Sequence, residues 1–245
     1  MSGERETILR YNRDLQEMEG YIYTGCQSSL SMYLFNKRAS QALYRLIRTN
    51  CRLLVDVGCG DGTFTVELAE HLGVSEAVGV EPSDAWQLAQ KKFAAHFPRI
   101  SFQQGSAYDL PYPRGHFDLA VMRGVLHHLD HPVRGLAEMA RVARYVLLLE
   151  PNGYNPLLKL IEKVSPYHRA HNEQSFSPGL IRYWLNKVGC QVVEDSFASL
   201  VPLFCPDRAA QFLNWLSPKW ESLPWLPKVS TGLYCIIAHS GSSMS

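Results

Sequence analysis

The 245-residue sequence lacks the features that would assign it to several common classes of protein. No uncharged apolar run approaches the roughly 20 residues that span a bilayer, so no transmembrane segment is expected. Neither sign of charge dominates, because 24 basic and 23 acidic side chains give a formal net charge of +1 without a basic block or an acidic tail. Nucleic-acid binding is therefore not expected, since it usually requires a basic face.

Paired cysteines are also absent, although the chain contains six cysteines. None of them belongs to a CxxC motif, and the stretch from Met1 to Glu19 is too polar for a secretory signal. These features predict free thiols in a reducing environment, and hence a cytoplasmic protein without a metal site built from cysteines.

What the sequence does contain is a regular alternation of strand and helix patterns. Apolar runs typical of strands occur at 53–57, 77–80, 100–103, 117–122, 145–149, 191–197 and 232–238. Helical spacing of apolar residues, or helix-forming composition, occurs within 5–19, 28–48, 64–72, 84–97, 132–143 and 178–188. This order predicts an α/β fold, with a Rossmann-like, doubly wound, mostly parallel seven-stranded sheet and helices on both faces.

The composition does not shift enough to mark a second domain, so residues 1–245 are expected to form one domain. We expect a helical lid at 1–49, a core at 50–152 and a C-terminal half at 153–245 with a helical insert at 202–228. The insert is rich in leucine, phenylalanine and tryptophan. We favour a cap that buries these side chains. An apolar surface for a lipid-like molecule, a membrane face or the second subunit of a homodimer is the alternative.

A glycine-rich turn follows the first expected strand. Between Leu53 and Thr63 the sequence reads LLVDVGCGDGT, so Gly58, Gly60 and Gly62 stand at alternate positions between a buried strand and a helix. Glycines let a ligand approach the backbone without meeting a Cβ atom, and the start of a helix presents unpaired N–H groups. The pattern predicts a nucleotide site at the carboxyl ends of the strands.

An acidic residue at the end of the next expected strand supports this prediction. Glu81 follows Asp56 by 25 residues, and an acid at that position of a nucleotide-binding sheet can accept hydrogen bonds from ribose hydroxyls. A glycine turn alone could be a simple turn, and a lone Glu81 could be a solvated loop carboxylate. The two together favour a nucleotide site.

Five segments in consecutive order resemble the class I S-adenosyl-L-methionine (AdoMet)-dependent methyltransferases of the small-molecule type. They are the turn 56–62, Glu81, and the segments 102–112, 117–129 and 147–151. The resemblance covers about residues 50–152 and implies AdoMet as the cofactor and methyl transfer as the activity. It also implies cofactor contacts from Asp56, Gly58, Cys59, Gly60, Gly62, Glu81, Pro82, Ser106, Ala107 and Arg123.

The resemblance also implies how these contacts are shared. Glu81 takes the ribose, Asp56 orients the turn and the cofactor ammonium, and Pro82, Ser106 and Ala107 face the adenine. Many relatives carry aspartate where this chain has Ser106, and a serine would accept the bond from the adenine amino group more weakly. Arg123 lies near the methionine end.

Two other functions remain open. A nicotinamide or flavin oxidoreductase would have the spacing GxGxxG, but position 63 here is threonine, so the third glycine comes one residue early. A protein that binds AdoMet without catalysis is the other alternative, since a fold does not fix a function. For an enzyme, we expect a small-molecule or lipid-linked acceptor.

A cluster of histidines follows the fourth expected strand. His127, His128 and His131 could in principle bind a metal, but they lie at a strand-to-helix junction without assured helical spacing, so no metal is expected. An acceptor hydroxyl or protonated amine loses a proton during methylation, and neutral histidine can accept it near physiological pH. His128 is the first candidate for this base and His127 the second, with alignment by the site alone as the alternative.

Substrate contacts are expected outside the five motifs. Tyr21, Tyr23 and Tyr33 could close over the cofactor as part of the lid. The stretch 152–177 is too long for a simple connection, and long loops at this edge of a sheet often carry function.

Overall fold

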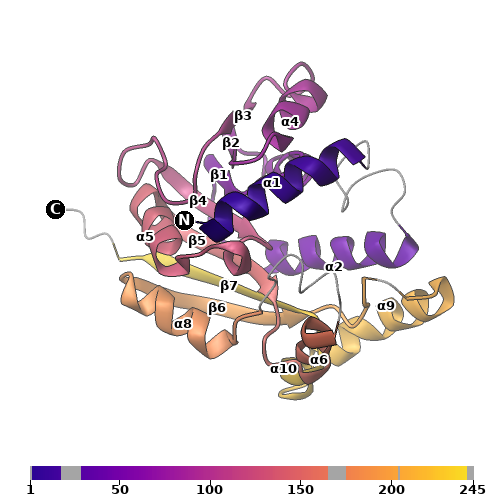
Figure 1. Ribbon diagram of the computed structural model, residues 1–245. Helices are drawn as coiled ribbons and strands as arrows, with labels where there is room; N and C mark the ends of the chain where they lie inside the picture. Colours follow the sequence, from indigo (N-terminus) through magenta and orange to yellow (C-terminus); the bar gives the residue numbers. More distant parts are fainter. Residues whose placement is uncertain (1, 18–28, 165–174, 204, 242–245) are drawn as a thin grey trace.

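The computed structural model describes residues 2–17, 29–164, 175–203 and 205–241 (Figure 1). Seven strands form one sheet in the order β3-β2-β1-β4-β5-β7-β6. Their bounds are β1 Leu53–Val57, β2 Glu76–Glu81, β3 Ile100–Gln104, β4 Phe117–Arg123, β5 Ala143–Pro151, β6 Cys190–Ala198 and β7 Leu233–Ser240. The pairs among β1 to β5 are parallel, and β7 runs antiparallel to both of its neighbours. The predicted fold class is confirmed.

Helices and one short 3₁₀ turn connect the strands. They are α1 Ser2–Glu17, α2 Leu30–Leu46, α3 Thr63–Leu72, α4 Ala85–Phe93, η1 Leu126–His128, α5 Pro132–Val142, α6 Pro156–Val164, α8 Pro178–Lys187, α9 Asp207–Glu221 and α10 Leu226–Ser230. The expected helix at 84–97 is shorter than predicted. It ends at Phe93, and the N–H groups of His96 and Phe97 both turn back to the carbonyl of Phe93.

Alternate strand residues face two separate cores, as expected for a sheet covered on both sides. Leu54 and its neighbours on one face pack against Leu43 of α2 and Leu68 of α3. Val55 faces the other way, into a core that includes Leu136 of α5. Burial of both faces explains why these strands read as continuous apolar runs in the sequence.

The strand order places the functional edge of the sheet. From β1, the chain proceeds through β2 to β3 on one side, and β4 and β5 lie on the other side. The carboxyl ends of β1 and β4 are therefore neighbours at the point where the order reverses, which is where open α/β sheets bind ligands. The pairing of Asp56 with Val121 brings the two strand ends together.

The predicted insert between β6 and β7 forms α9 and α10, which lie beside α2 and α6 at the lower side of Figure 1. The favoured interpretation, a cap that buries its aromatic side chains, is wrong for three of them. Phe212, Trp215 and Trp225 are 58%, 63% and 66% exposed. The segment contacts α2 through a small apolar cluster that includes Leu34 and Ala210, and through an ion pair in which Arg38 of α2 lies 2.7 Å from Glu221 of α9, with both side chains only 6% exposed.

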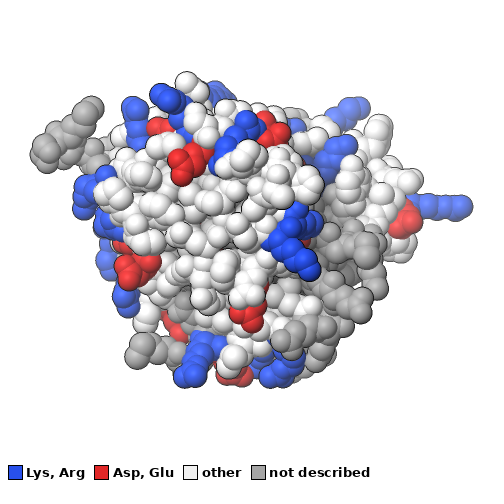
Figure 2. All heavy atoms as spheres, turned by 90° about the horizontal axis from the view of Figure 1, so that it is seen from above, with Lys and Arg blue, Asp and Glu red and all other residues white. Residues whose placement is uncertain are grey.

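On the face in Figure 2, an area without charged side chains is bordered by basic and acidic residues, with a basic group immediately to its right and an acidic group below it. Within the described ranges, every helix is too short or too polar to cross a membrane.

Candidate active site

The glycine turn has a backbone conformation that favours glycine. Gly58, Gly60 and Gly62 have φ angles of 79°, 55° and 75°, in the left-handed region that other residues rarely adopt. The N–H groups of Gly58 and Cys59 donate to the carbonyl of Val80, which ties the turn to the end of β2. The protein's own hydrogen bonds thus hold the turn in this conformation.

Close packing adds a second requirement that the sequence did not reveal. A Cβ atom on Gly58 would lie 2.5 Å from a methyl group of Val125, and one on Gly62 would lie 2.5 Å from the ring of Phe102. At these two positions, packing by the protein itself already excludes a side chain. Packing within the protein therefore requires glycine at these positions, in addition to the expected approach of a ligand to the backbone.

The carboxylate of Glu81 lies directly against this turn. Its Oε2 accepts a hydrogen bond from the N–H of Gly60 at 3.0 Å, and its Oε1 accepts from the N–H and the hydroxyl of Ser83 at 3.0 and 2.5 Å. Glu81 is 8% exposed, and burial raises its pKa. The ends of β1 and β2 therefore lie together, as expected from the sequence, and the carboxylate that joins them is buried.

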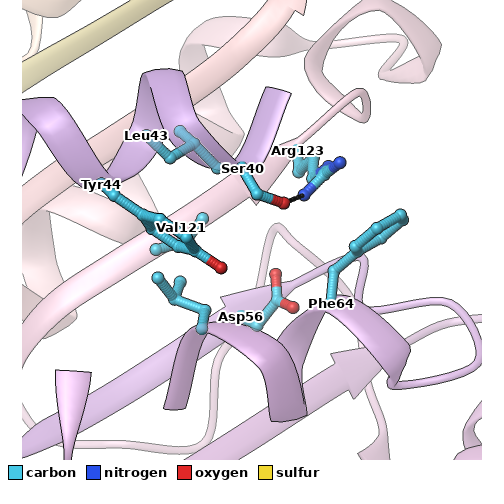
Figure 3. Close-up of a pocket in the computed structure, with 8 residues that line it drawn as sticks. Ser40, Leu43, Tyr44, Asp56, Phe64, Val121 and Arg123 are labelled. Carbon is cyan, nitrogen blue, oxygen red and sulfur yellow. Dashed lines mark hydrogen bonds between the residues drawn. The ribbon is translucent and has the colours of Figure 1, made fainter. Parts of the chain in front are cut away.

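A pocket lies next to the turn, between the sheet and α2 (Figure 3). Asp56 enters it from β1 and accepts a hydrogen bond from the hydroxyl of Thr65 at 2.6 Å. Burial raises the pKa of Asp56 to about 6 and lowers the pKa of Arg123, on the opposite wall, to about 10. The guanidinium carbon of Arg123 lies 3.5 Å from the centroid of the Phe64 ring. The pocket thus holds one group of each charge.

Helix α2 forms one wall of this pocket, and the sequence predicted the helix but not the side chains that line the pocket. Ser40 and Tyr44 of α2 line the pocket, and the Ser40 hydroxyl accepts a hydrogen bond from Nη1 of Arg123 at 3.0 Å. The sequence placed α2 in a lid but did not mark these residues, because an amphipathic helix does not show which polar side chain meets a strand end. Tyr33 of the same helix is 56% exposed, whereas Tyr21 and Tyr23 lie outside the described residues.

The segment expected to face adenine lies at the same edge of the sheet. The N–H of Gly105 donates to the carbonyl of Glu81 at 3.2 Å, so Ser106 and Ala107 follow immediately beside the end of β2. Ser106 accepts a local hydrogen bond from the N–H of Tyr108, and Ala107 is buried. Pro82 adjoins the segment, because its carbonyl accepts a bond from the Gln104 amide at 3.3 Å. Cys59 is buried among apolar groups, and burial raises the pKa of its thiol.

The three histidines have different polar partners, although the ring centroids of His127 and His128 lie only 4.0 Å apart. Nδ1 of His127 lies 2.7 Å from Oε2 of Glu150, and Nε2 of His128 lies 3.0 Å from the hydroxyl of Tyr11. His131 precedes α5, and its N–H donates to the hydroxyl of Tyr108. Over the described ranges, no group of three or more His, Cys, Asp or Glu side chains could hold a metal ion.

Comparisons with known proteins bear on this arrangement. Residues 54–145 match a family model described as a methyltransferase domain. An uncharacterized methyltransferase of Schizosaccharomyces pombe is 36% identical over 123 residues, 47% of this chain and 42% of the relative. Residues 54–145 are therefore similar to the methyltransferase domain of the class I AdoMet-dependent methyltransferases.

Two further proteins are similar to this chain. Ajmaline N-methyltransferase of Rauvolfia serpentina is 29% identical over 172 residues, 68% of this chain and 51% of the relative. The chain thus spans about half the length of the curated relatives it matches. Magnesium protoporphyrin IX methyltransferase of Synechocystis, solved with bound S-adenosylhomocysteine (AdoHcy), shares the fold with a TM-score of 0.68 at 14% identity, covering 96% of this chain and 99% of that one.

The residues at the strand ends fit AdoMet, the cofactor of this family. Oε2 of Glu81 accepts one hydrogen bond from the protein, and a carboxylate oxygen can accept two, so it retains capacity for a ribose hydroxyl. Asp56 and Arg123 present opposite charges in the adjoining pocket, which suits the ammonium and carboxylate of a methionine group. The strand ends therefore offer an acceptor for a ribose and, beside it, one group of each charge.

Proposed function

We propose that this methyltransferase transfers a methyl group from AdoMet to a small-molecule or lipid-linked acceptor. The observation that carries the proposal is the hydrogen bond from the N–H of Gly60 to the buried carboxylate of Glu81. This bond places a carboxylate that can accept ribose hydroxyls directly against the glycine turn. AdoMet supplies a methyl group activated by a sulfonium. The protein has to hold the cofactor, align an acceptor and exclude water.

In this proposal the strand ends share the cofactor between them. Glu81 accepts the ribose hydroxyls, and Pro82, Ser106 and Ala107 lie along the adenine. The turn formed by Gly58, Cys59, Gly60 and Gly62 passes beneath the methionine and the ribose. Asp56 and Arg123 hold the methionine group in their pocket. Their opposite charges and buried position support this assignment.

A small acceptor is favoured by two findings. The similar ajmaline N-methyltransferase is named for a small-molecule acceptor, and the face in Figure 2 shows no continuous basic area of the kind that nucleic acids require. The exposed aromatic side chains of α9 and its neighbour Trp225 suit a lipid-linked acceptor. A histidine of η1, His128 or His127, would take the acceptor proton.

The proposal is tested by incubating the protein with AdoMet labelled in its methyl group and a panel of acceptors. A hydroquinone, a catechol, a primary amine and a tertiary amine cover the chemistry of small acceptors. We expect label in at least one product with the unaltered chain and a much slower reaction with Glu81→Gln. Tight AdoHcy binding without any product would support a non-catalytic AdoMet protein instead, and binding of NAD(P) but not AdoHcy would support an oxidoreductase.

A further inference from the structure

A buried carboxylate on β5 holds the start of η1. Glu150 is 1% exposed, and its Oε1 accepts hydrogen bonds from the N–H groups of Val125 and Leu126 at 3.0 and 2.9 Å. The first N–H groups of a helical turn have no partner within that turn. Glu150 supplies that partner from a neighbouring strand, so its carboxylate has a fixed orientation.

The second oxygen of this carboxylate meets a histidine. Oε2 of Glu150 lies 2.7 Å from Nδ1 of His127, and the His127 side chain is 8% exposed. A carboxylate that accepts two bonds from N–H groups through one oxygen acts as an acceptor through the other as well. We propose that Glu150 is a positioning residue that keeps the proton of His127 on Nδ1, so that Nε2 is the atom that accepts the acceptor's proton. This inference rests on the proposed methyl transfer.

The fold places His127 at the right end of the cofactor site. Val125, two residues earlier, packs against Gly58 of the glycine turn. Glu81 lies on the β2 side of β1, whereas η1 follows β4 on the opposite side. If Glu81 holds the ribose, the methyl group and the acceptor must lie toward β4, where His127 stands.

The contact of the neighbouring histidine does not fix a tautomer in the same way. Nε2 of His128 lies 3.0 Å from the hydroxyl of Tyr11. A phenol can donate or accept a hydrogen bond, so this contact is compatible with a proton on either nitrogen of His128. A carboxylate at Nδ1 of His127 is the stronger orienting device, and it resembles the acid–histidine pairing that hydrolases use for the same purpose.

The proton step balances without a further reactant. The acceptor X–H gives its proton to Nε2 of His127, its electron pair bonds the methyl carbon, and the former C–S bonding pair stays on sulfur. The resulting imidazolium lies beside the Glu150 carboxylate, which compensates its charge in a buried place. Release of the proton to water restores the neutral ring.

The tautomer can be measured without knowing the acceptor. In the full chain labelled with ¹⁵N-histidine and saturated with AdoHcy, two-bond ¹⁵N–¹H correlations should show His127 protonated at Nδ1. In Glu150→Gln, the amide oxygen keeps the two backbone bonds and the NH₂ group faces Nδ1, so the proton should move to Nε2. The exposed Glu76→Gln is the matched control and should leave the spectrum unchanged. A proton on Nε2 in the unaltered chain, or no change in Glu150→Gln, overturns the positioning role.

Turnover then separates the two histidines. With the acceptor methylated in the panel described above, His127→Asn should lower kcat by about 10² to 10⁴-fold and Glu150→Gln by at least about tenfold. The KM for AdoMet should stay within about twofold in both, a split that a general loss of structure would not give. The exposed His96→Asn is the control. A large loss in His128→Asn with little loss in His127→Asn overturns the inference. If no acceptor is methylated, the proposed function fails, while the tautomer measurement still decides the role of Glu150.

Discussion

The hydroxyl of Tyr11 lies 3.0 Å from Nε2 of His128, and this contact joins residues 117 positions apart in the chain. The next residue, Asn12, accepts a hydrogen bond from the N–H of Asp84 at 2.8 Å. Helix α1 therefore touches the turn after β4 and the loop after β2, the two sides of the candidate site, and crosses in front of the strands in Figure 1. These two bonds hold the helix expected to act as a lid.

Tyr11→Phe should loosen α1 without disturbing the sheet. One hydrogen bond contributes about 1 kcal/mol, so amide hydrogen exchange within 5–17 should become about fivefold faster. Exchange in β1 and β4 should stay the same. Arg10→Ala, which removes only a surface ion pair with Glu6, is the control on the same helix. Equal exchange in Tyr11→Phe and the unaltered chain would show that the phenol does not hold α1.

Glu81→Gln should weaken AdoHcy binding by about 10- to 100-fold. The amide has one acceptor oxygen in place of two, so it cannot accept from Gly60 and Ser83 and also serve a ribose, and hydrogen bonds to a charged group contribute about 1.5–3 kcal/mol. Isothermal titration calorimetry measures the affinity, and Glu76→Gln at the exposed start of the same strand is the control. An affinity within about twofold of the original would remove Glu81 from the cofactor site.

Gly62→Ala and Gly73→Ala form a matched pair that separates backbone strain from packing. Both glycines have positive φ, 75° and 62°, but only at position 62 would the new Cβ meet the ring of Phe102. Gly73→Ala should cost about 1 kcal/mol from its left-handed backbone alone. Gly62→Ala should cost about 1–3 kcal/mol more, because the ring must move. Urea denaturation measures both, and Phe102→Leu should recover part of the larger loss. Equal losses would mean that Phe102 yields freely.

The strands could be predicted from the sequence because burial on both faces leaves apolar runs, such as 145–149 and, interrupted only by Asp56, 53–57. The meeting of Glu81 with the glycine turn could also be predicted, since consecutive parallel strands end at one edge. The partner of His127 could not be predicted, because Glu150 is 23 residues away and a glutamate at the end of a strand is equally consistent with a solvated side chain. Helix α6 was not among the expected helices, although its sequence PLLKLIEKV has apolar residues at helical spacing, because it lies in the stretch 152–177 that was interpreted as a long loop; none of its side chains is buried.

Asp56→Asn should change how the stability of the free protein depends on pH. The Asp56 pKa is raised from 3.8 to about 6, because burial outweighs the hydrogen bond from Thr65 and the charge of Arg123. Between these two values the folded state binds more protons than the unfolded state, so this group makes stability fall as pH rises from about 4 to about 6. A shift of about two units corresponds to roughly 3 kcal/mol at pH 7.

Asparagine retains an acceptor for the Thr65 hydroxyl and cannot ionise, so it removes this penalty. Burial also raises the pKa of Glu81, which contributes with the same sign, but Glu81 is present in both proteins, so the difference between the two curves reports on the replacement of Asp56. Urea denaturation from pH 4 to 7.5 should show Asp56→Asn gaining stability relative to the unaltered chain up to about pH 6 and remaining ahead above it. The exposed Asp207→Asn is the control. Parallel curves would mean that Asp56 is already ionised throughout this range. Its negative charge would then be available to the cofactor ammonium at every pH tested, so AdoHcy affinity would be the same at pH 5 and pH 7. If Asp56 titrates near pH 6, AdoHcy affinity should instead rise between pH 5 and 7.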